Sequence, residues 1–298
     1  MSDNNPKIWR IVDLLEWSKE YLHKKGVESP QIEAEMMLRQ ILNLSRIEIY
    51  LNHDQIVEPG ERQKLKDYLL KRGSGIPIQY ILGYTEFMGY RIEVSPDTLI
   101  PRHDTEVIID NIWEEFDKDL EIEIIDLCTG SGCIVAALAL HFEKSQADAL
   151  DISQSALKIA TKNFKYHNIS DRVKTIQQDL TQDQRLPKQY DLIISNPPYI
   201  SGEMYNQLDS LVKDNEPYIA LNPGADELLF YKIIAEMTQS YLKPDGSLYV
   251  EIGGNYQVKD ITNIFVGKGL QNLEIIKDYN GISRGIKATN GKKTQSIS

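Results

Sequence analysis

The chain has 298 residues, of which 41% are hydrophobic and 26% are charged, as in an ordinary soluble globular protein. Its formal net charge of −11 argues against a nucleic-acid backbone as the main partner, because such binding requires clustered lysine and arginine. The polar start at residues 1–6, the short apolar runs and the two cysteines predict a reduced, cytoplasmic protein without a membrane span. Its five histidines are scattered singly, so we expect no metal site.

Residues 1–80 are predicted to form a small helical domain. Ser29-Pro30 is typical of a helix start, and Ser45 followed by Glu48 matches a capping box before another short helix. Composition alone assigns this domain no chemistry. A docking or recognition module is the role that fits it best.

Residues 81–100 are predicted to be a β-hairpin linker, because Gly89 lies near the middle of a run with aromatic and β-branched flanks. From residue 101 to 298, strands and helices alternate regularly. We expect strands at residues 121–126, 148–152, 173–178, 192–195 and 247–252, and helices at residues 105–116, 134–142, 156–164, 227–241 and 258–266. This pattern predicts an α/β domain with a doubly wound sheet. It closes with an antiparallel C-terminal edge hairpin around Asn280-Gly281, which would give the sheet one reversed edge strand.

The segment that joins the first strand of this domain to its helix is a candidate cofactor loop. Its glycines allow a tight turn and a close approach of the backbone to a ligand at the helix N-terminus. A dinucleotide fingerprint requires a further glycine where Val135 stands, so NAD is disfavoured. The predicted cofactor-binding residues in this loop are Asp126, Cys128, Thr129, Gly130, Ser131 and Gly132.

Two further acids end the next two strands and are predicted to complete the cofactor site. Asp151 is placed to accept both hydroxyls of a ribose, whether the ribose belongs to NAD or to S-adenosylmethionine. Asp179 is placed near an adenine edge. Either acid could instead cap a helix or lie in a solvated loop, since acids favour such positions.

Asn196, Pro197, Pro198 and Tyr199 follow an apolar strand and are the predicted catalytic residues, with Asn196 also beside the cofactor. The Asn196 side chain and the Pro197 carbonyl offer two acceptors on a rigid frame. Such a pair can hold both hydrogens of an –NH2 group and direct its lone pair toward an electrophile. The Tyr199 ring can lie against the planar group that carries this nitrogen.

These motifs resemble the release factor glutamine methyltransferases, the HemK/PrmC family of the class I S-adenosylmethionine-dependent fold. The resemblance also covers residues 77–83, 96–102, 151–153, 251–253 and 278–284, together with Glu216-Pro217 and Ala220-Leu221. It implies that the cofactor is S-adenosylmethionine and that the substrate is the glutamine of the Gly-Gly-Gln motif in peptide chain release factors. The helical domain would then help to hold this protein substrate, and we expect a monomer.

The chain departs from the pattern of that family at two places. Cys128 stands where the cofactor loop of the family usually begins with glycine, and a small side chain that points away would be harmless there. Residues 101–106 differ from the usual entrance segment of the family, which leaves Arg102 and Asp104 without an assigned role. For Cys128 and Cys133 we favour small apolar packing over a nucleophilic role.

Two other classes of function compete with this interpretation. An amino-adenine methyltransferase of DNA or RNA could use the same quartet on a flipped base, but it would need a basic channel. A scaffold that binds without catalysis would not need the loop, the ribose acid and the quartet together.

Overall fold

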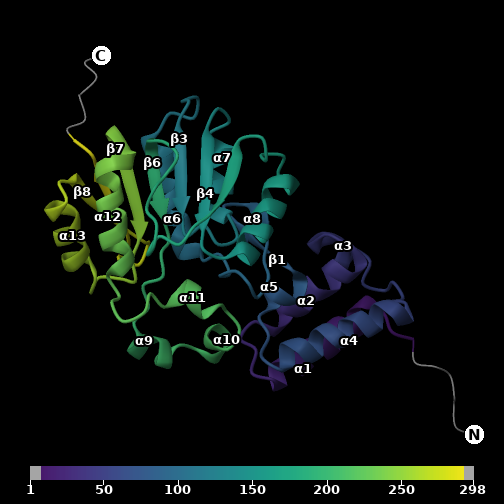
Figure 1. Ribbon diagram of the computed structural model, residues 1–298. Helices are drawn as coiled ribbons and strands as arrows, with labels where there is room; N and C mark the ends of the chain where they lie inside the picture. The colour runs from purple at the N-terminus through teal and green to yellow at the C-terminus, as the bar shows by residue number, and fades with distance from the viewer. Residues whose placement is uncertain (1–7, 292–298) are drawn as a thin grey trace, which may run out of the picture. The chain divides into compact units, whose positions relative to one another are not determined.

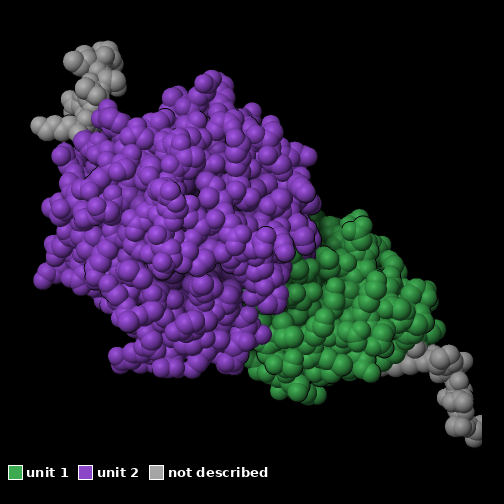
Figure 2. All heavy atoms as spheres, viewed as in Figure 1, with its two compact units in different colours: residues 1–83 green, residues 84–298 purple. Residues whose placement is uncertain are grey.

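The computed structural model describes residues 8–291, which form two compact units divided between Gly83 and Tyr84 (Figures 1 and 2). Residues 1–6, on which the expectation of no secretory signal partly rests, lie outside this range. In the described part of the chain, no helix is long and apolar enough to cross a membrane.

The first unit is helical. Its helices are α1 (Ile11–Lys24), α2 (Pro30–Leu42), α3 (Arg46–Leu51), α4 (Pro59–Gly73) and α5 (Ile78–Leu82). The Ser45 hydroxyl accepts from the Glu48 amide at 3.2 Å and the Glu48 carboxylate accepts from the Ser45 amide at 2.7 Å, which is the reciprocal pair of a capping box. Pro30 opens α2, although the Ser29 side chain makes no capping hydrogen bond.

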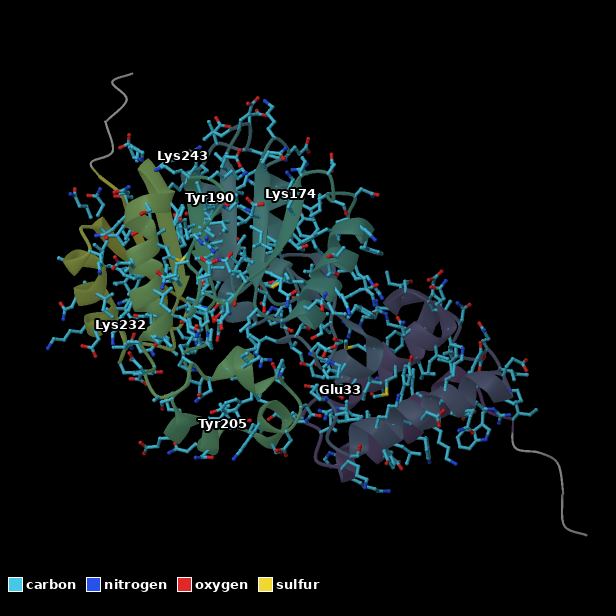
Figure 3. All side chains as sticks on the ribbon, in the orientation of Figure 1. Glu33, Lys174, Tyr190, Tyr205, Lys232 and Lys243 are labelled. Carbon is cyan, nitrogen blue, oxygen red and sulfur yellow. The ribbon has the colours of Figure 1, made fainter. Side chains whose placement is uncertain are left out.

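A buried ion pair fastens two helices of this unit. The guanidinium of Arg72 on α4 donates two hydrogen bonds to Glu33 on α2, at 2.6 and 3.1 Å. Glu33 lies among the helices in Figure 3. Because both side chains are largely removed from water, the two-point contact matters more than a surface pair would.

The second unit begins with a two-stranded hairpin, β1 (Tyr84–Phe87) and β2 (Tyr90–Glu93). Met88 and Gly89 both have positive φ, at 51° and 75°, as a tight two-residue hairpin turn requires. The Asn163 side chain bonds the backbone of Glu93 in both directions, at 2.7 and 3.0 Å. The hairpin is therefore fastened to the second unit.

The main sheet of this unit has seven strands in the order β5-β4-β3-β6-β7-β9-β8 within the described residues. They are β3 (Glu123–Leu127), β4 (Gln146–Asp151), β5 (Val173–Gln177), β6 (Tyr190–Ser195), β7 (Leu242–Glu251), β8 (Gln271–Lys277) and β9 (Ser283–Thr289). Strands β3 to β7 pair in parallel, and β9 is antiparallel to both β7 and β8. The α/β class and the C-terminal edge hairpin are confirmed.

One detail of the predicted topology is wrong: the reversed strand is not the edge strand. β9 lies between β7 and β8, so β8 forms the edge and runs parallel to β7. The physical reason is that α13 carries the chain past one position in the sheet before β8. The hairpin then returns β9 into that open position.

Helices pack on the sheet as two groups. Helices α6 (His103–Glu115), α7 (Cys133–His141) and α8 (Gln154–Tyr166) contact one another in sequence, and α12 (Leu229–Tyr241) contacts α13 (Val258–Gly267). α12 lies over β7 in Figure 1. Three short helices that the sequence pattern did not predict follow β6: α9 (Gly202–Gln207), α10 (Ser210–Lys213) and α11 (Tyr218–Leu221).

The chain turns in opposite directions from two central strands, β3 and β6. Their register pairs Leu127 with Ser195, so the loops after both strands begin side by side. The Ser195 hydroxyl donates to the Leu127 carbonyl at 2.7 Å and fastens the two strand ends together. In an open α/β sheet, such a switch point is where ligands bind.

Candidate active site

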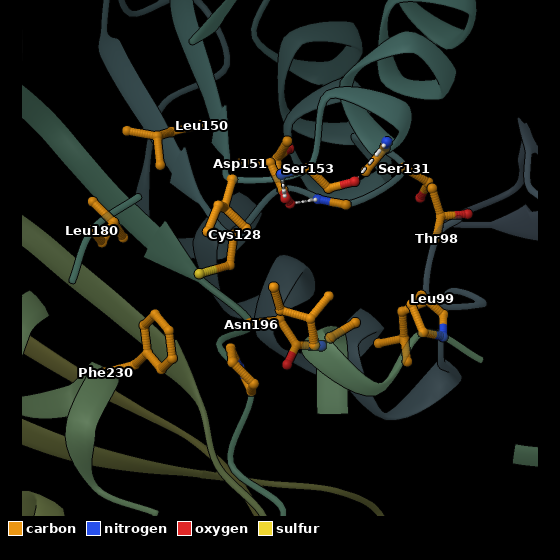
Figure 4. A pocket seen from close by; sticks show the side chains of 18 of the residues that line it. Thr98, Leu99, Cys128, Ser131, Leu150, Asp151, Ser153, Leu180, Asn196 and Phe230 are labelled. Carbon is orange, nitrogen blue, oxygen red and sulfur yellow. Dashed lines mark hydrogen bonds between the residues drawn. The ribbon is translucent and has the colours of Figure 1, made fainter. Parts of the chain in front are cut away.

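A cavity of about 490 Å³ opens at this switch point, within the size range of small-molecule sites (Figure 4). Three of its walls are the loops that follow β3, β4 and β6. The figure shows Cys128, Asp151 and Asn196, one from each loop, around the same opening. Residues 178–181, which follow β5, parts of segments 97–105 and 217–224 and the side chain of Phe230 also line the cavity.

The predicted cofactor loop divides into residues that face the cavity and residues that support them. Thr129, Gly130 and Ser131 line the cavity, with Gly130 at a φ of 55° and open space where a Cβ would stand. Gly132 does not line the cavity. A Cβ at this position would come within 2.9 Å of the Phe164 ring. The loop thus needs Gly132 for its packing against α8.

Asp126 is also behind the cavity wall. It is fully buried, and its carboxylate accepts from the Thr129 hydroxyl at 2.6 Å. Burial raises the pKa of Asp126 to about 7, while the hydrogen bonds from Thr129 and the Val135 amide lower it. The structure gives Asp126 the position of a loop support rather than of a cavity-lining residue.

Cys128 does not meet the condition under which its side chain would be harmless in the loop, because the side chain does not point away from the cavity. It has a φ of 62°, in the left-handed region that glycine tolerates and other residues adopt at a cost. Its side chain lines the cavity (Figure 4). The reason is that the left-handed backbone directs Cβ toward the ligand side of the loop.

Neither thiol has the environment of a nucleophile. Burial, followed by the charges of Asp151 and Asp126, raises the pKa of Cys128. Burial and Asp126 raise the pKa of Cys133 to about 12. A thiol that stays protonated is a weak nucleophile, so both side chains act here as small packing groups.

Asp151 lies at the end of β4 and faces the cavity. Its carboxylate accepts from the Gly130 amide at 2.8 Å through Oδ2 and from the Ser153 amide at 2.8 Å through Oδ1. Burial raises the pKa of Asp151, and these backbone donors lower it. Ser153 caps α8, so Asp151 does not serve as that cap.

Asp179 also lines the cavity, two residues beyond the end of β5. One of its oxygens accepts from the backbone and the hydroxyl of Thr181, at 2.9 and 2.7 Å. The side chain thus fixes a turn, and that turn forms part of the wall together with Leu180. The other carboxylate oxygen has no protein donor within the described residues.

The structure separates the four predicted catalytic residues into two pairs. Asn196 and Pro198 line the cavity, and Pro197 and Tyr199 do not. The Tyr199 hydroxyl donates to Glu251 at 3.1 Å. Its ring lies against Gly253, where an added Cβ would be 3.1 Å away.

Sequence reasoning missed several residues of the rim. Arg102 lines the cavity and donates to the buried carboxylate of Glu216 at 2.5 Å, and the Ile100 amide donates to the same carboxylate at 3.2 Å. Asp104 instead pairs with Arg284 at 2.8 Å. The one available signal was that the entrance segment and the Glu216-Pro217 pair belong to the same family resemblance, but nothing in the sequence indicated that they meet.

The residues fit S-adenosylmethionine on three observations. The open space at Gly130 leaves room for a ligand against the backbone. Asp151 is fixed by two amides with its carboxylate at the cavity. Leu150, Ile152 and Leu180 give the same wall an apolar surface of the kind that an adenine ring needs. Within residues 8–291, no cluster of three or more histidine, cysteine or acidic side chains could hold a metal ion.

Fold and site together define a class I methyltransferase. The family described as the PrmC N-terminal domain matches residues 13–83, and the methyltransferase small domain matches residues 105–224. The chain is 36% identical to the release factor glutamine methyltransferase of Geobacter sulfurreducens, over 94% of this chain and 96% of that protein. It is 33% identical to the one of Rhodopirellula baltica, over the same shares of the two chains. The chain belongs to the family of release factor glutamine methyltransferases.

A solved structure of the hMettl16 catalytic domain in complex with an RNA hairpin is also similar. It has a TM-score of 0.52 at 18% identity and covers 92% of this chain and 91% of its own. At this identity the likeness concerns the fold alone.

Proposed function

We propose that this protein transfers a methyl group from S-adenosylmethionine to the side-chain amide nitrogen of the glutamine in the Gly-Gly-Gln motif of class 1 peptide chain release factors. The observation that carries this proposal is the placement of Asn196 and Asp151 on two walls of one cavity. The membership of the chain in the family of release factor glutamine methyltransferases supports the choice of substrate.

Bound S-adenosylmethionine would supply an electrophilic methyl group on its sulfonium. Asp151 would accept the ribose hydroxyls, since a carboxylate oxygen that already accepts one amide retains a lone pair. The turn at Asp179 would lie along the adenine edge, and Thr129, Gly130 and Ser131 would meet the ligand with their backbone. The Cys128 side chain would narrow the cavity between the loops after β3 and β6. Asp126 and Gly132 would hold the loop from behind.

Asn196 would orient the substrate amide. An amide nitrogen is a poor nucleophile because its lone pair is delocalised into the carbonyl. The Asn196 side chain, which lines the cavity, would accept one N–H of the glutamine. The Pro197 carbonyl and the Tyr199 ring do not line the cavity, so they would have to meet the substrate amide outside it, where the carbonyl would accept the second N–H and the ring would support the amide plane. Positive charge develops on this nitrogen as the bond forms, so the two acceptors bind more strongly in the transition state.

Pro198 would hold the geometry, because two adjacent proline rings fix the backbone of the quartet. With reacting atoms about 3–3.5 Å apart and in line, no strong base is required. The proton would leave after transfer, because a methylated, charged amide nitrogen is very acidic.

We further infer a division of labour along the chain. Residues 1–80 would recognise the release factor, residues 81–100 would link the domains, and residues 101–298 would carry the chemistry. We infer a cytoplasmic monomer that acts on translation termination, and light scattering on the purified protein tests the oligomeric state.

Mass spectrometry tests the activity directly. Purified enzyme and S-adenosylmethionine are incubated with a candidate release factor, with DNA and with RNA in separate reactions. We expect one added methyl group on the glutamine of the Gly-Gly-Gln motif and none on nucleic acid. Methylated adenine with an unmodified release factor would favour the amino-adenine alternative, and cofactor binding without any transfer would favour a scaffold.

A further inference from the structure

A buried carboxylate behind the quartet has no part in the mechanism so far. Glu251 ends β7, the strand next to β6, and its side chain is 3% exposed. Its Oε2 accepts from the Thr105 hydroxyl at 2.5 Å, and its Oε1 accepts from the Tyr199 hydroxyl at 3.1 Å. Thr105 lines the cavity, so Glu251 joins the entrance segment to the predicted catalytic tyrosine.

A second carboxylate that bonds side chains of β7 shows how unusual this placement is. Glu115 ends α6, its side chain is 8% exposed, and it accepts from the hydroxyls of Ser247 and Tyr249 on β7, at 2.9 and 2.5 Å. However, the Lys287 ammonium lies 2.5 Å from Glu115 and balances its charge. Glu251 has no ion-pair partner in the described part of the chain, where Arg284 pairs instead with Asp104 and Asp278.

Burial of a carboxyl group without a cation costs free energy, so fold stability alone does not favour glutamate here. Buried carboxyl groups of this kind are usually retained, despite their cost in stability, where the group serves a function. The neighbour that Glu251 fixes is Tyr199, in the motif that follows β6.

We propose that Glu251 is a positioning residue for methyl transfer, whose carboxylate holds the Tyr199 hydroxyl and so fixes the tyrosine ring and the adjoining Asn196 against the substrate amide. This inference rests on the proposed function. Other contacts restrain Tyr199: its ring lies against Gly253, and the Gln257 side chain donates to its backbone carbonyl at 3.5 Å. Gln257 in turn accepts from the Gly253 amide at 2.7 Å.

The charge of Glu251 gives the inference a second readout. Burial, with a smaller contribution from the charge of Asp104, raises the pKa of Glu251 to about 7 against the lowering effects of Thr105, Tyr199 and Arg284. An ionised carboxylate in a low-dielectric site would favour the positive charge that develops on the substrate nitrogen. Turnover should therefore rise with pH through this range. The titratable or charged groups that act on Glu251 and Tyr199 are Arg102, Asp104, Cys133, Tyr231, Tyr256 and Arg284.

The experiment compares Glu251→Ala, Glu251→Gln and Tyr199→Phe with the wild type on a release factor substrate. We expect Glu251→Ala to lower kcat about 10- to 100-fold, the range in which loss of an orienting hydrogen bond falls, with cofactor affinity by calorimetry unchanged within about threefold. Glu251→Gln retains one acceptor, so its kcat should fall between that of Glu251→Ala and that of the wild type. At saturating cofactor it should also lose the rise of kcat between about pH 6 and 8.

Two further variants make the result specific. Glu115→Gln alters the carboxyl at the end of α6 that bonds side chains of β7 and does not line the cavity, and its kcat should match the wild type. The double variant Glu251→Ala with Tyr199→Phe should be no slower than Glu251→Ala alone, because both changes break one contact. Calorimetry of release factor binding in the presence of S-adenosylhomocysteine measures substrate positioning without turnover. The affinity for the release factor should be lower in Glu251→Ala than in the wild type.

The outcomes separate this inference from the function on which it rests. A wild-type enzyme that leaves the release factor glutamine unmodified contradicts the proposed function. A wild-type enzyme that methylates it, with Glu251→Ala folded and equally fast, overturns the inference alone. Equal losses in Glu115→Gln and Glu251→Gln, or additive effects in the double variant, would also overturn it, since the role would then be general packing.

Discussion

The amide of Gly130 donates to Oδ2 of Asp151 at 2.8 Å, so the glycine loop and the acid of the neighbouring strand hold each other in place. The Ser153 amide holds the other oxygen at the same distance. One carboxylate thus shapes the loop and faces the cavity, and its removal should affect both.

We expect Asp151→Ala to weaken S-adenosylmethionine binding about 10- to 100-fold, because hydrogen bonds to a charged group contribute roughly 1.5–3 kcal/mol. Isothermal titration calorimetry measures this effect. Asp183→Ala is the matched control, since Asp183 pairs with Arg185 in a loop and does not line the cavity. Unchanged affinity in Asp151→Ala would place the ribose site elsewhere.

Asn196→Ala should act on turnover rather than on binding. Loss of one of two acceptors for the substrate amide should lower kcat by about 100-fold, the lower end of the effect of losing an oriented hydrogen bond in an active site. Cofactor affinity should change by no more than about threefold. Single-turnover assays with a release factor measure the first quantity, and near-normal turnover would falsify the role of Asn196 as an acceptor.

The left-handed backbone of Cys128 predicts an order of tolerance at this position. Cys128→Val should destabilise the fold by about 1–2 kcal/mol and reduce cofactor affinity, since a β-branched residue is strained at positive φ and Cβ lies on the ligand side. Cys128→Gly should bind the cofactor about as well as the wild type. Thermal melts and calorimetry of both variants give the order. Cys133→Val, at the first residue of α7, adds the same side chain to the cavity lining at a position without positive φ.

The buried carboxyl of Asp126 predicts a pH dependence of stability. The folded protein holds this proton up to about pH 7, whereas the ordinary pKa at which the unfolded chain releases it is 3.8. The contribution of this group to stability is therefore fully present below about pH 4 and is lost as pH rises to about 7. Between these two pH values, the free energy of unfolding falls by up to about 1.4 kcal/mol per pH unit.

Urea unfolding of Asp126→Asn at several pH values tests this dependence. The variant should lose this part of the slope, because an amide does not titrate. Asp260→Asn, an exposed change at the start of α13, should keep the slope of the wild type. Because the pKa of Glu251 is also raised to about 7, part of the slope should remain in Asp126→Asn, and a slope equal to that of the wild type would contradict the assignment to Asp126.

Much of the architecture could be predicted because the main strands carry apolar runs that are buried on both faces. Residues 192–194 of β6 and residues 124 and 125 of β3 are completely or almost completely buried, and the motifs that follow them therefore lie at strand ends. A helix start was also predicted correctly where the capping residues are close in the sequence, as at Ser45 and Glu48.

The partners of the site were not predictable, because they are distant in the sequence. Arg102 meets Glu216 across 114 positions, and Thr105 meets Glu251 across 146. No periodicity in one sequence joins such pairs. Backbone conformation was also hidden at Cys128, since nothing local indicates that a residue other than glycine has positive φ.

The place of β9 has a consequence for biosynthesis. Ser283–Thr289 is the last strand along the described residues, yet it fills an interior position between β7 and β8, with Gly285 packed against Ile108 and Val250. A nascent chain that lacks it has two open strand edges, which invite pairing with other chains. The methyltransferase sheet can therefore close only after β9 has been synthesised, and a premature stop before residue 283 should leave an aggregation-prone product.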